Sequence, residues 1–306
     1  MPVASPNSLP KDLATFLAKP PIHWLSTTAD VVSKDDDHRN YVWRGMVQGT
    51  DISQPPSQMA LKYFENSSVK ISIELACGVA AMALKLPVPI PALVICDRAY
   101  LPQLPASING SLLLLFGSQL VPEDAFMATF RKNDRAAEEF VWNKVCADSV
   151  GQKGAAWDEL IANDDRHHLN LIFGGRWWLF DHDKAIPSAS RAANNFLNDL
   201  LPNEFSSFPL KLNQLAEQML KRRPNDHGIN EQTKELDKQK SRLQAMNHFV
   251  ASWASQVDDS RLKGIFTIAA ICTNLIAGRL PSLAMHLGNR TGGKNGESLW
   301  TSPDLN

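Results

Sequence analysis

The chain has 306 residues, of which 44% are hydrophobic and 21% charged, so it can bury a core and lacks the composition of a disordered protein. Its 31 Lys and Arg residues nearly balance its 32 Asp and Glu residues. This balance argues against a dedicated nucleic-acid binder, which needs a basic face to neutralise phosphates, but it allows a local pocket for a small anion. The length favours about two domains or lobes.

Targeting and redox features point to the cytoplasm. The four cysteines lie far apart, with neither C-x-x-C nor zinc-binding spacing, which is typical of free thiols in a reducing compartment. Residues 1–20 lack a basic segment followed by an apolar run, so they predict a loose, proline-rich lead-in and no signal peptide. The longest apolar stretch, residues 264–278, is shorter than the ~20 residues of a membrane span and predicts a buried helix. We expect a soluble, cytoplasmic protein without a membrane span.

Residues 21–118 predict a small β-rich lobe. Apolar runs bounded by turn residues predict strands at residues 41–47, 58–64, 92–96 and 111–116. Between the second and third of these, apolar side chains recur every three or four positions, which predicts a helix over residues 68–86. Pro87 ends this helix because proline cannot continue it.

After residue 118 the pattern is mostly helical and predicts a larger lobe over residues 119–287, with the boundary near residues 117–123. Helices are predicted at residues 136–146, 155–161, 190–201, 210–221, 231–243, 247–256 and 261–277. One short hairpin, residues 169–180, turns at the pair Gly174-Gly175. Residues 288–306 are rich in Gly, Asn, Ser and Thr and predict a flexible tail. The whole pattern predicts an α+β fold.

The densest group of polar residues lies at the two ends of this hairpin. The sequence N-D-D-R-H-H-L-N, residues 163–170, precedes the first strand, and F-D-H-D, residues 180–183, follows the second. If the turn pairs Phe173 with Arg176, then Asn170 lies opposite Leu179 and close to Asp181. An acidic cluster at the end of apolar strands is typical of a site for a hard cation or for proton transfer.

These two motifs resemble the catalytic and metal-binding loops of the HipA-like kinases. More distantly they resemble those of the phosphatidylinositol kinases, where D-R-H-x-x-N is followed by a metal-binding Asp. Upstream, A-L-K-Y-F at residues 60–64 resembles the strand that carries the family's lysine, and L-P-V-P-I-P at residues 86–91 resembles the segment after its helix. The likeness spans residues 41–187. It implies a bilobal protein-kinase-like fold and a kinase that transfers the γ-phosphate of ATP, with Mg²⁺, to a hydroxyl of a protein Ser or Thr or of a small molecule.

The resemblance also implies roles for individual residues. Asp165 would orient or deprotonate the acceptor hydroxyl, and Asn170 and Asp181 would coordinate Mg²⁺. Lys62 would hold the phosphates while pairing with Glu74. Glu74 borders the apolar stripe of its helix, where an inward carboxylate is costly unless a cation meets it. A Lys–Glu pair would meet that requirement.

Five further positions are candidates for nucleotide binding. The chain has no G-x-G-x-x-G, so Gly49 with Thr50 is the candidate phosphate-binding turn. Gly117, Ser118 and Gln119 follow the last predicted strand and would form the hinge that contacts the nucleotide.

Some features leave other functions open. Asp164 precedes Asp165, and we assign the catalytic role to Asp165 because it directly precedes Arg166-His167, as in the family. The histidines and carboxylates of the two motifs could instead form the metal site of a phosphohydrolase. The missing glycine-rich loop would suit an inactive kinase-fold module that binds a nucleotide or a partner.

Overall fold

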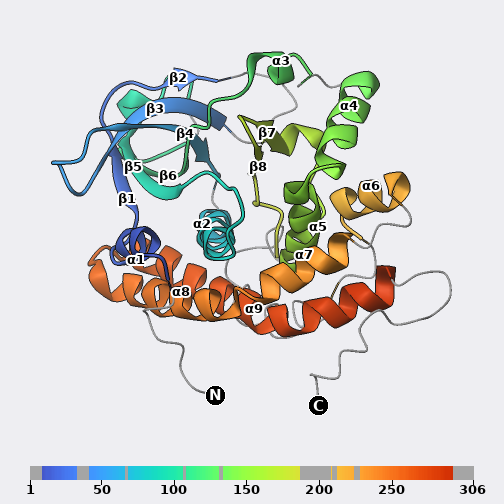
Figure 1. Cartoon of the computed structure of the whole chain (residues 1–306). Coiled ribbons are helices and arrows are strands. Elements are labelled where there is room, and N and C mark those ends of the chain that lie inside the picture. Colours follow the sequence, from blue (N-terminus) through green and yellow to red (C-terminus); the bar gives the residue numbers. More distant parts are fainter. Residues whose placement is uncertain are drawn as a thin grey trace.

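The computed structural model describes residues 9–32, 41–65, 68–105, 108–130, 134–186, 208, 212–223 and 228–291 (Figure 1). Its strands are β1 (Ile22–Leu25), β2 (Asp30–Val31), β3 (Tyr41–Gly49), β4 (Ser57–Tyr63), β5 (Pro91–Asp97), β6 (Leu112–Gln119), β7 (Leu171–Phe173) and β8 (Trp177–Leu179). Its α-helices are α1 (Lys11–Leu17), α2 (Ser68–Ala83), α3 (Ala125–Ala128), α4 (Arg135–Cys146), α5 (Ser149–Ile161), α6 (Gln214–Arg222), α7 (Gly228–Asp237), α8 (Lys240–Trp253) and α9 (Ser260–Thr291). The mixed α+β class is therefore confirmed.

The first six strands form one sheet in the order β1-β5-β6-β4-β3-β2. Strand β1 runs parallel to β5 and also pairs antiparallel with β3, so that five strands close on themselves. Apolar side chains such as Trp43, Leu61 and Val94 fill the interior. Because side chains alternate along a strand, Lys62 next to Leu61 points out of this interior. The closed sheet thus holds Lys62 on its outer face, on the central strand β4.

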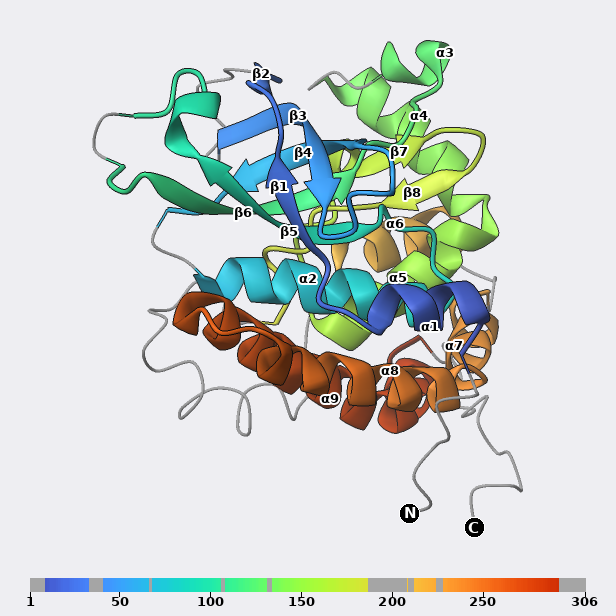
Figure 2. The same ribbon diagram turned by 90° about the vertical axis from the view of Figure 1, so that its left-hand side faces the viewer.

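Helix α2 lies between the sheet and the helices α8 and α9 (Figure 2). It contacts β5 and β6 on one side and α8 and α9 on the other, which explains why nearly every position is buried. A helix that is apolar on all sides belongs in a core. Glu74, in the middle of this helix, is one of its few charged residues and is only 2% exposed.

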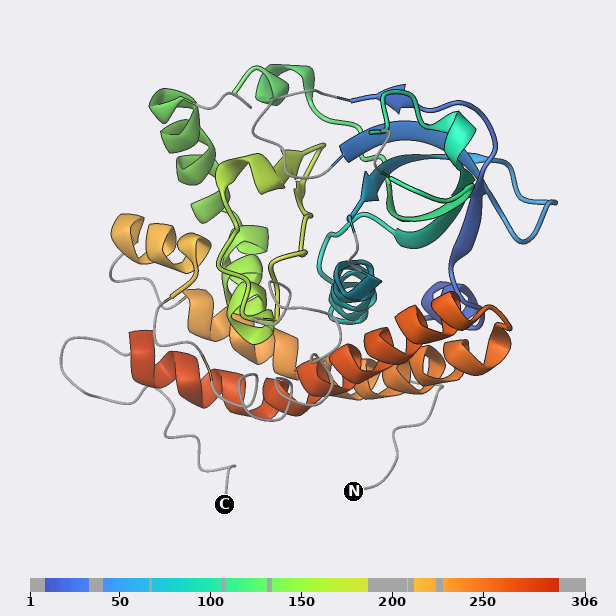
Figure 3. The ribbon, with the colours of Figure 1, turned by 180° about the vertical axis from the view of Figure 1, so that it is seen from behind.

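Of the helices that the structure describes, α9 is the one with the length and apolarity of a membrane span, with a mean hydropathy of 1.4. It passes below both the sheet and the helices α5 and α7 (Figure 3). The helix is longer than predicted, because Leu280, Leu283 and Leu287 carry its buried face past Pro281. It packs mainly against α2 and α8, and 39% of its most apolar 18-residue window is buried.

The structure corrects several predicted elements. The lead-in contains a helix, α1, which is anchored because Trp253 Nε1 donates a 2.8 Å hydrogen bond to the backbone oxygen of Leu17. The strands β1 and β2 and the short helix α3 were not predicted. The predicted helix at residues 231–243 is divided between α7 and α8, and the one at 210–221 begins only at Gln214, capped by Asn213.

The C-terminal end of the predicted larger lobe also differs from the prediction. Helix α9 continues to Thr291, so the predicted tail begins inside it, and residues 292–306 lie outside the described residues, as does the predicted helix at 190–201. The β-rich part precedes the helical part, and β6 ends at Gln119, within the predicted boundary. The division into two lobes stays a prediction. All four cysteines are buried and free, as predicted.

Candidate functional site

The end of helix α5 positions the segment that carries Asp165. The helix ends at Ile161, and the next residue, Ala162, has a φ of 54° that turns the chain away. Asn163 is held by Asp158 of the helix, because Asn163 Nδ2 donates to Asp158 Oδ1 at 3.2 Å. The Asn163 side-chain oxygen in turn accepts a 3.2 Å hydrogen bond from the backbone N–H of Asp165. A chain of hydrogen bonds thus fixes Asp165 to the buried helix.

Arg166 joins the two motifs that the sequence places at the ends of the hairpin. It is fully buried and makes two hydrogen bonds with Asp158, from Nε at 3.0 Å and from Nη2 at 2.9 Å. Its Nη1 donates to the backbone oxygens of Asn170, at 3.2 Å, and of Phe180. Sequence reasoning gave Arg166 no role of its own, yet it holds the backbone beside both Asn170 and Asp181.

The hairpin β7–β8 differs by one residue from the predicted register. Phe173 pairs with Trp177 and Leu171 with Leu179, because the turn contains three residues, Gly174-Gly175-Arg176. Asn170 lies in a short 3₁₀ helix before β7 and is not opposite Leu179. Asn170 and the segment of Asp181 nevertheless lie close together, since Arg166 Nη1 donates to the backbone oxygens of both Asn170 and Phe180, and both Asn170 and Asp181 line the same cavity.

Gly174 of this turn packs against the chain that follows β6. A Cβ atom on Gly174 would lie 2.0 Å from the backbone oxygen of Pro122, whereas one on Gly175 would meet nothing within 4 Å. We therefore expect Gly174→Ala to lower the free energy of unfolding by about 1–3 kcal/mol, because backbone must shift to admit the methyl group. Urea unfolding measures this, with Gly175→Asn as the control, since Asn tolerates the positive φ of 74° there. Equal losses for the two variants would contradict this packing.

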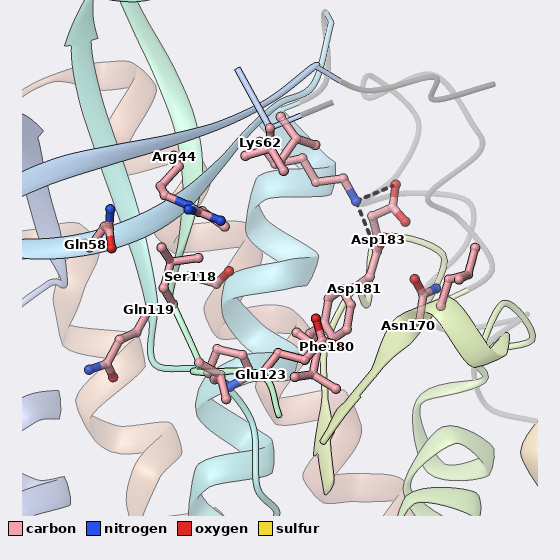
Figure 4. Close-up of a pocket in the computed structure, with 18 of the residues that line it drawn as sticks. Arg44, Gln58, Lys62, Ser118, Gln119, Glu123, Asn170, Phe180, Asp181 and Asp183 are labelled. Carbon is pink, nitrogen blue, oxygen red and sulfur yellow. Dashed lines mark hydrogen bonds and ion pairs between the residues drawn. The ribbon is translucent and has the colours of Figure 1, made fainter. Parts of the chain in front are cut away.

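Lys62 is the centre of an ion-pair cluster (Figure 4). Its Nζ donates a 2.6 Å hydrogen bond to Asp181 Oδ1 and lies 3.7 Å from Glu74 Oε1 and 3.7 Å from Asp183 Oδ2. Glu74 Oε2 also accepts a 2.9 Å hydrogen bond from the backbone N–H of His182. The predicted Lys62–Glu74 pair is present, and Glu74 additionally fixes the segment that carries Asp181.

Burial and charge pairing shift the pKa values in this cluster. Burial alone would lower the pKa of Lys62, but the three surrounding carboxylates outweigh it and raise the pKa above its usual value. Burial likewise disfavours the charge on Asp181, yet contact with Lys62 holds the pKa of Asp181 well below its usual range. Burial raises the pKa of Glu74 to about 7 and that of Asp183 to about 6. Near neutral pH, Lys62 and Asp181 are therefore both charged.

The cluster lies at one end of a cavity of about 1430 Å³. Figure 4 shows Lys62, Asn170, Asp181 and Asp183 on one side of it. The opposite side is lined by Arg44, Gln58, Ser118 and Gln119. The cavity thus joins the ion-pair cluster around Lys62 to a second end where Arg44 lies among the polar side chains of β4 and β6.

Of the residues predicted for the site, those that line this cavity are Lys62, Ser118, Gln119, Asp165, Asn170 and Asp181. Glu74 lies behind Lys62 and does not line the cavity. Asp164 is exposed and outside it, which separates the two neighbouring carboxylates by position.

The glycine candidates are not at the cavity. Gly49 and Thr50 lie at the far end of β3, where Gly49 pairs with His23, whereas Val42 at the other end pairs with Lys62. Seven residues of strand, about 23 Å, separate the two ends. Gly117 faces the interior of the closed sheet, where its Cβ would lie 2.7 Å from Val94 Cγ2. Gly49, Thr50 and Gly117 therefore do not line the cavity.

Strands β2 and β3 border the cavity at the end of the sheet that carries Lys62. Val32, directly after β2, and Val42, in β3, both line the cavity. Residues 33–40 between them lie outside the described residues. Their sequence, S-K-D-D-D-H-R-N, contains no glycine.

Several residues of the cavity wall were missed by sequence reasoning. Arg44 pairs with Ala60 across β3 and β4, two residues before Lys62, so strand register could have placed it on the same face. Lys70 precedes Glu74 by four residues, a spacing that puts both on one face of a helix. Gln58 lies four residues before Lys62 on the same strand, so alternation also places it on the face of Lys62, whereas Glu123 carries no sequence signal of this kind.

The histidines do not assemble the metal site that a phosphohydrolase would need. His167 lines the cavity, but His168 and His182 are buried away from it. Burial lowers the pKa of His182 to about 3, so its ring is neutral, and the ring lies against Trp157. The described residues contain no group of three or more His, Cys, Asp or Glu residues that could hold a metal ion.

Comparison with known proteins bears on the fold. No protein-family model matches the chain, and no curated protein matches its sequence. Among solved structures, it is similar to the crystal structure of the Helicobacter pylori proinflammatory kinase CtkA, with a TM-score of 0.51 and 10% identity. The similarity covers 85% of this chain and 98% of that one. At this identity the likeness concerns the fold alone, which is kinase-like.

Proposed function

We propose that the chain is a kinase that transfers the γ-phosphate of Mg-ATP to a hydroxyl acceptor, a Ser or Thr of a protein. One observation carries the proposal. The carboxylates of Glu74 on α2 and Asp181 after β8 both lie within 3.7 Å of the Nζ atom of Lys62 on β4, so three separate elements meet at one ammonium group. Phosphoryl transfer requires a lysine that is fixed beside the phosphates and carboxylates that hold the cation.

The shape of the cavity supports one orientation of the nucleotide. Its base would lie toward Ser118 and Gln119, and its phosphates toward Lys62. Lys62 then stabilises the negative charge of the phosphates, and Glu74 holds the ammonium group in place. The cavity of about 1430 Å³ exceeds the usual size of a small-molecule pocket, roughly 300–1,000 Å³, and so leaves room for an acceptor segment.

The donor set fits Mg²⁺. Asn170 Nδ2 donates a 2.9 Å hydrogen bond to the backbone oxygen of Asp165, which leaves the Asn170 side-chain oxygen available, and Asp181 contributes a charged carboxylate. Hard oxygen ligands of this kind suit Mg²⁺. Bound there, the cation would neutralise charge on the transferred phosphoryl group. We propose Asn170 and Asp181 as its ligands.

Asp165 is the residue we assign to the acceptor. Its backbone is fixed on both sides by Asn163 and Asn170, while its carboxylate accepts no hydrogen bond from the described residues. It also lines the cavity. A carboxylate held in this way can accept the proton of an acceptor hydroxyl or orient that hydroxyl toward the phosphate.

A nucleotide-binding module without catalysis is the second candidate function. The observation that favours it is the absence of glycine from residues 33–40, which connect the strands beside Lys62. Such a module would bind Mg-ATP and leave the γ-phosphate intact. The transfer assay below distinguishes the two.

We expect Asp181→Asn to abolish the dependence of ATP affinity on Mg²⁺ and to reduce phosphate transfer below detection, because the amide carries no charge for the cation. Asn fits the backbone, since Asp181 has a positive φ of 61° and Asn adopts this region as Asp does. Calorimetry with and without Mg²⁺ measures binding, and γ-labelled ATP with a cell lysate measures transfer. Asp237→Asn, in the exposed end of α7, is the control. A wild-type protein that binds no nucleotide, or a variant that transfers phosphate normally, would refute the proposal.

A further inference from the structure

A second lysine stands at the charged end of the cavity. Lys70 is in the first turn of α2, lines the cavity, and has a side chain only 22% exposed. Its Nζ lies 3.6 Å from Asp183 Oδ2, the same oxygen that lies 3.7 Å from Lys62 Nζ. Two ammonium groups from different elements thus share one carboxylate oxygen.

The ring of Phe64 also joins the two lysines. Lys62 Nζ lies 4.9 Å from the centre of this ring, and Lys70 Nζ lies 5.6 Å from it. Both distances are within the range of cation–π attraction, and Phe64 is only 4% exposed. The pair of ammonium groups is therefore oriented by a buried aromatic side chain as well as by Asp183.

The negative charge around Lys62 explains what a second lysine contributes at this end of the cavity. Three carboxylates surround Lys62, and Asp183, only 3% exposed, faces the cavity where phosphates would bind. Lys62 Nζ is thus shared among three carboxylates, and Lys70 brings a second positive charge to the same end of the cavity. A polyphosphate that binds there adds negative charge, which a second cationic side chain offsets.

We infer that Lys70 is a second phosphate-binding residue, which acts with Lys62 on the polyphosphate of a nucleoside triphosphate. The inference rests on the function proposed above. Without nucleotide, Asp183 holds the Lys70 ammonium group at the cavity. When a nucleotide binds, Lys70 contacts a phosphate oxygen in place of the Asp183 oxygen. The ammonium group of Lys70 therefore moves little, because Asp183 already holds it at the cavity.

The test compares ligands with and without phosphates. We expect Lys70→Met to weaken Mg-ATP binding about tenfold, the cost of losing one charge-assisted contact, and to leave adenosine binding unchanged. Lys70→Arg retains the charge and should restore most of the affinity for ATP. Lys263→Met, in the first turn of α9 and exposed, is the matched control and should change neither ligand. Calorimetry measures ATP, and competition against labelled ATP measures adenosine.

A double variant separates phosphate binding from simple screening of Asp183. If Lys70 only screens that carboxylate, adding Asp183→Asn to Lys70→Met restores wild-type ATP affinity, and the inference is wrong. If Lys70 contacts phosphate, the double variant still binds ATP weakly. If the wild-type protein binds ATP and Lys70→Met binds it equally well, the role of Lys70 is wrong while the proposed function stands. A wild-type protein that binds no ATP overturns the proposed function as well.

Discussion

Asp165→Asn is expected to lower the rate of phosphate transfer by about 10²–10⁴-fold, the usual contribution of a positioned general base. The substitution removes the negative charge and keeps the size of the side chain. The contacts that hold this segment use the backbone N–H and carbonyl of Asp165, so they should persist. ATP affinity should therefore stay close to that of the wild type while the transfer rate falls. Single-turnover assays with γ-labelled ATP measure the rate, and calorimetry measures the affinity.

The neighbouring carboxylate provides the control for this prediction. Asp164 is exposed and does not line the cavity, so Asp164→Asn removes the same charge one residue away. We expect it to transfer phosphate at close to the wild-type rate. Equal losses in both variants would indicate a general effect of charge on this segment. A normal rate in Asp165→Asn would exclude Asp165 as the base.

The strands and helices that carry the site follow from local sequence patterns. Alternating and continuous apolar runs indicated β3, β4, β5 and β6, and the spacing of apolar residues indicated α2. The resemblance to the HipA-like kinases likewise pointed to Lys62, Asp165 and Asp181, which all line the cavity. Such features depend on residues close together in the sequence or on side-chain chemistry.

The remaining features depend on contacts between distant segments. Strand β2 has two residues and is defined by its pairing with β3, so no periodicity could reveal it. Gly49 and Thr50 were the candidate phosphate-binding turn, but only the register of β3 with β4 shows that Lys62 lies at the other end of β3. The hairpin register could not be predicted either, because a pair of glycines permits turns of two or of three residues.

The buried ion pair of Arg166 with Asp158 is the clearest feature of the site that the sequence did not indicate. Both side chains are 0% exposed. Asp158 lies in a helix and Arg166 in the motif after it, and charged residues at such positions are usually exposed. The structure explains their burial, because Arg166 donates hydrogen bonds to the backbone oxygens of Asn170 and Phe180, beside the proposed cation ligands.

We expect Arg166→Met to lower the free energy of unfolding by about 3–5 kcal/mol, because it leaves the Asp158 carboxylate buried without a counter-ion. Two backbone carbonyls would lose their donor as well. Replacing both partners, with Arg166→Met and Asp158→Leu, should recover part of this loss, since no unpaired charge remains, but should not restore the positions of Asn170 and Asp181. Urea unfolding measures the stability of each variant. The control is Arg261→Met, which breaks an exposed Arg–Asp pair with Asp259 at 3.3 Å and should cost less than about 1 kcal/mol. Similar losses for Arg166→Met and Arg261→Met would show that the buried pair does not hold the site together.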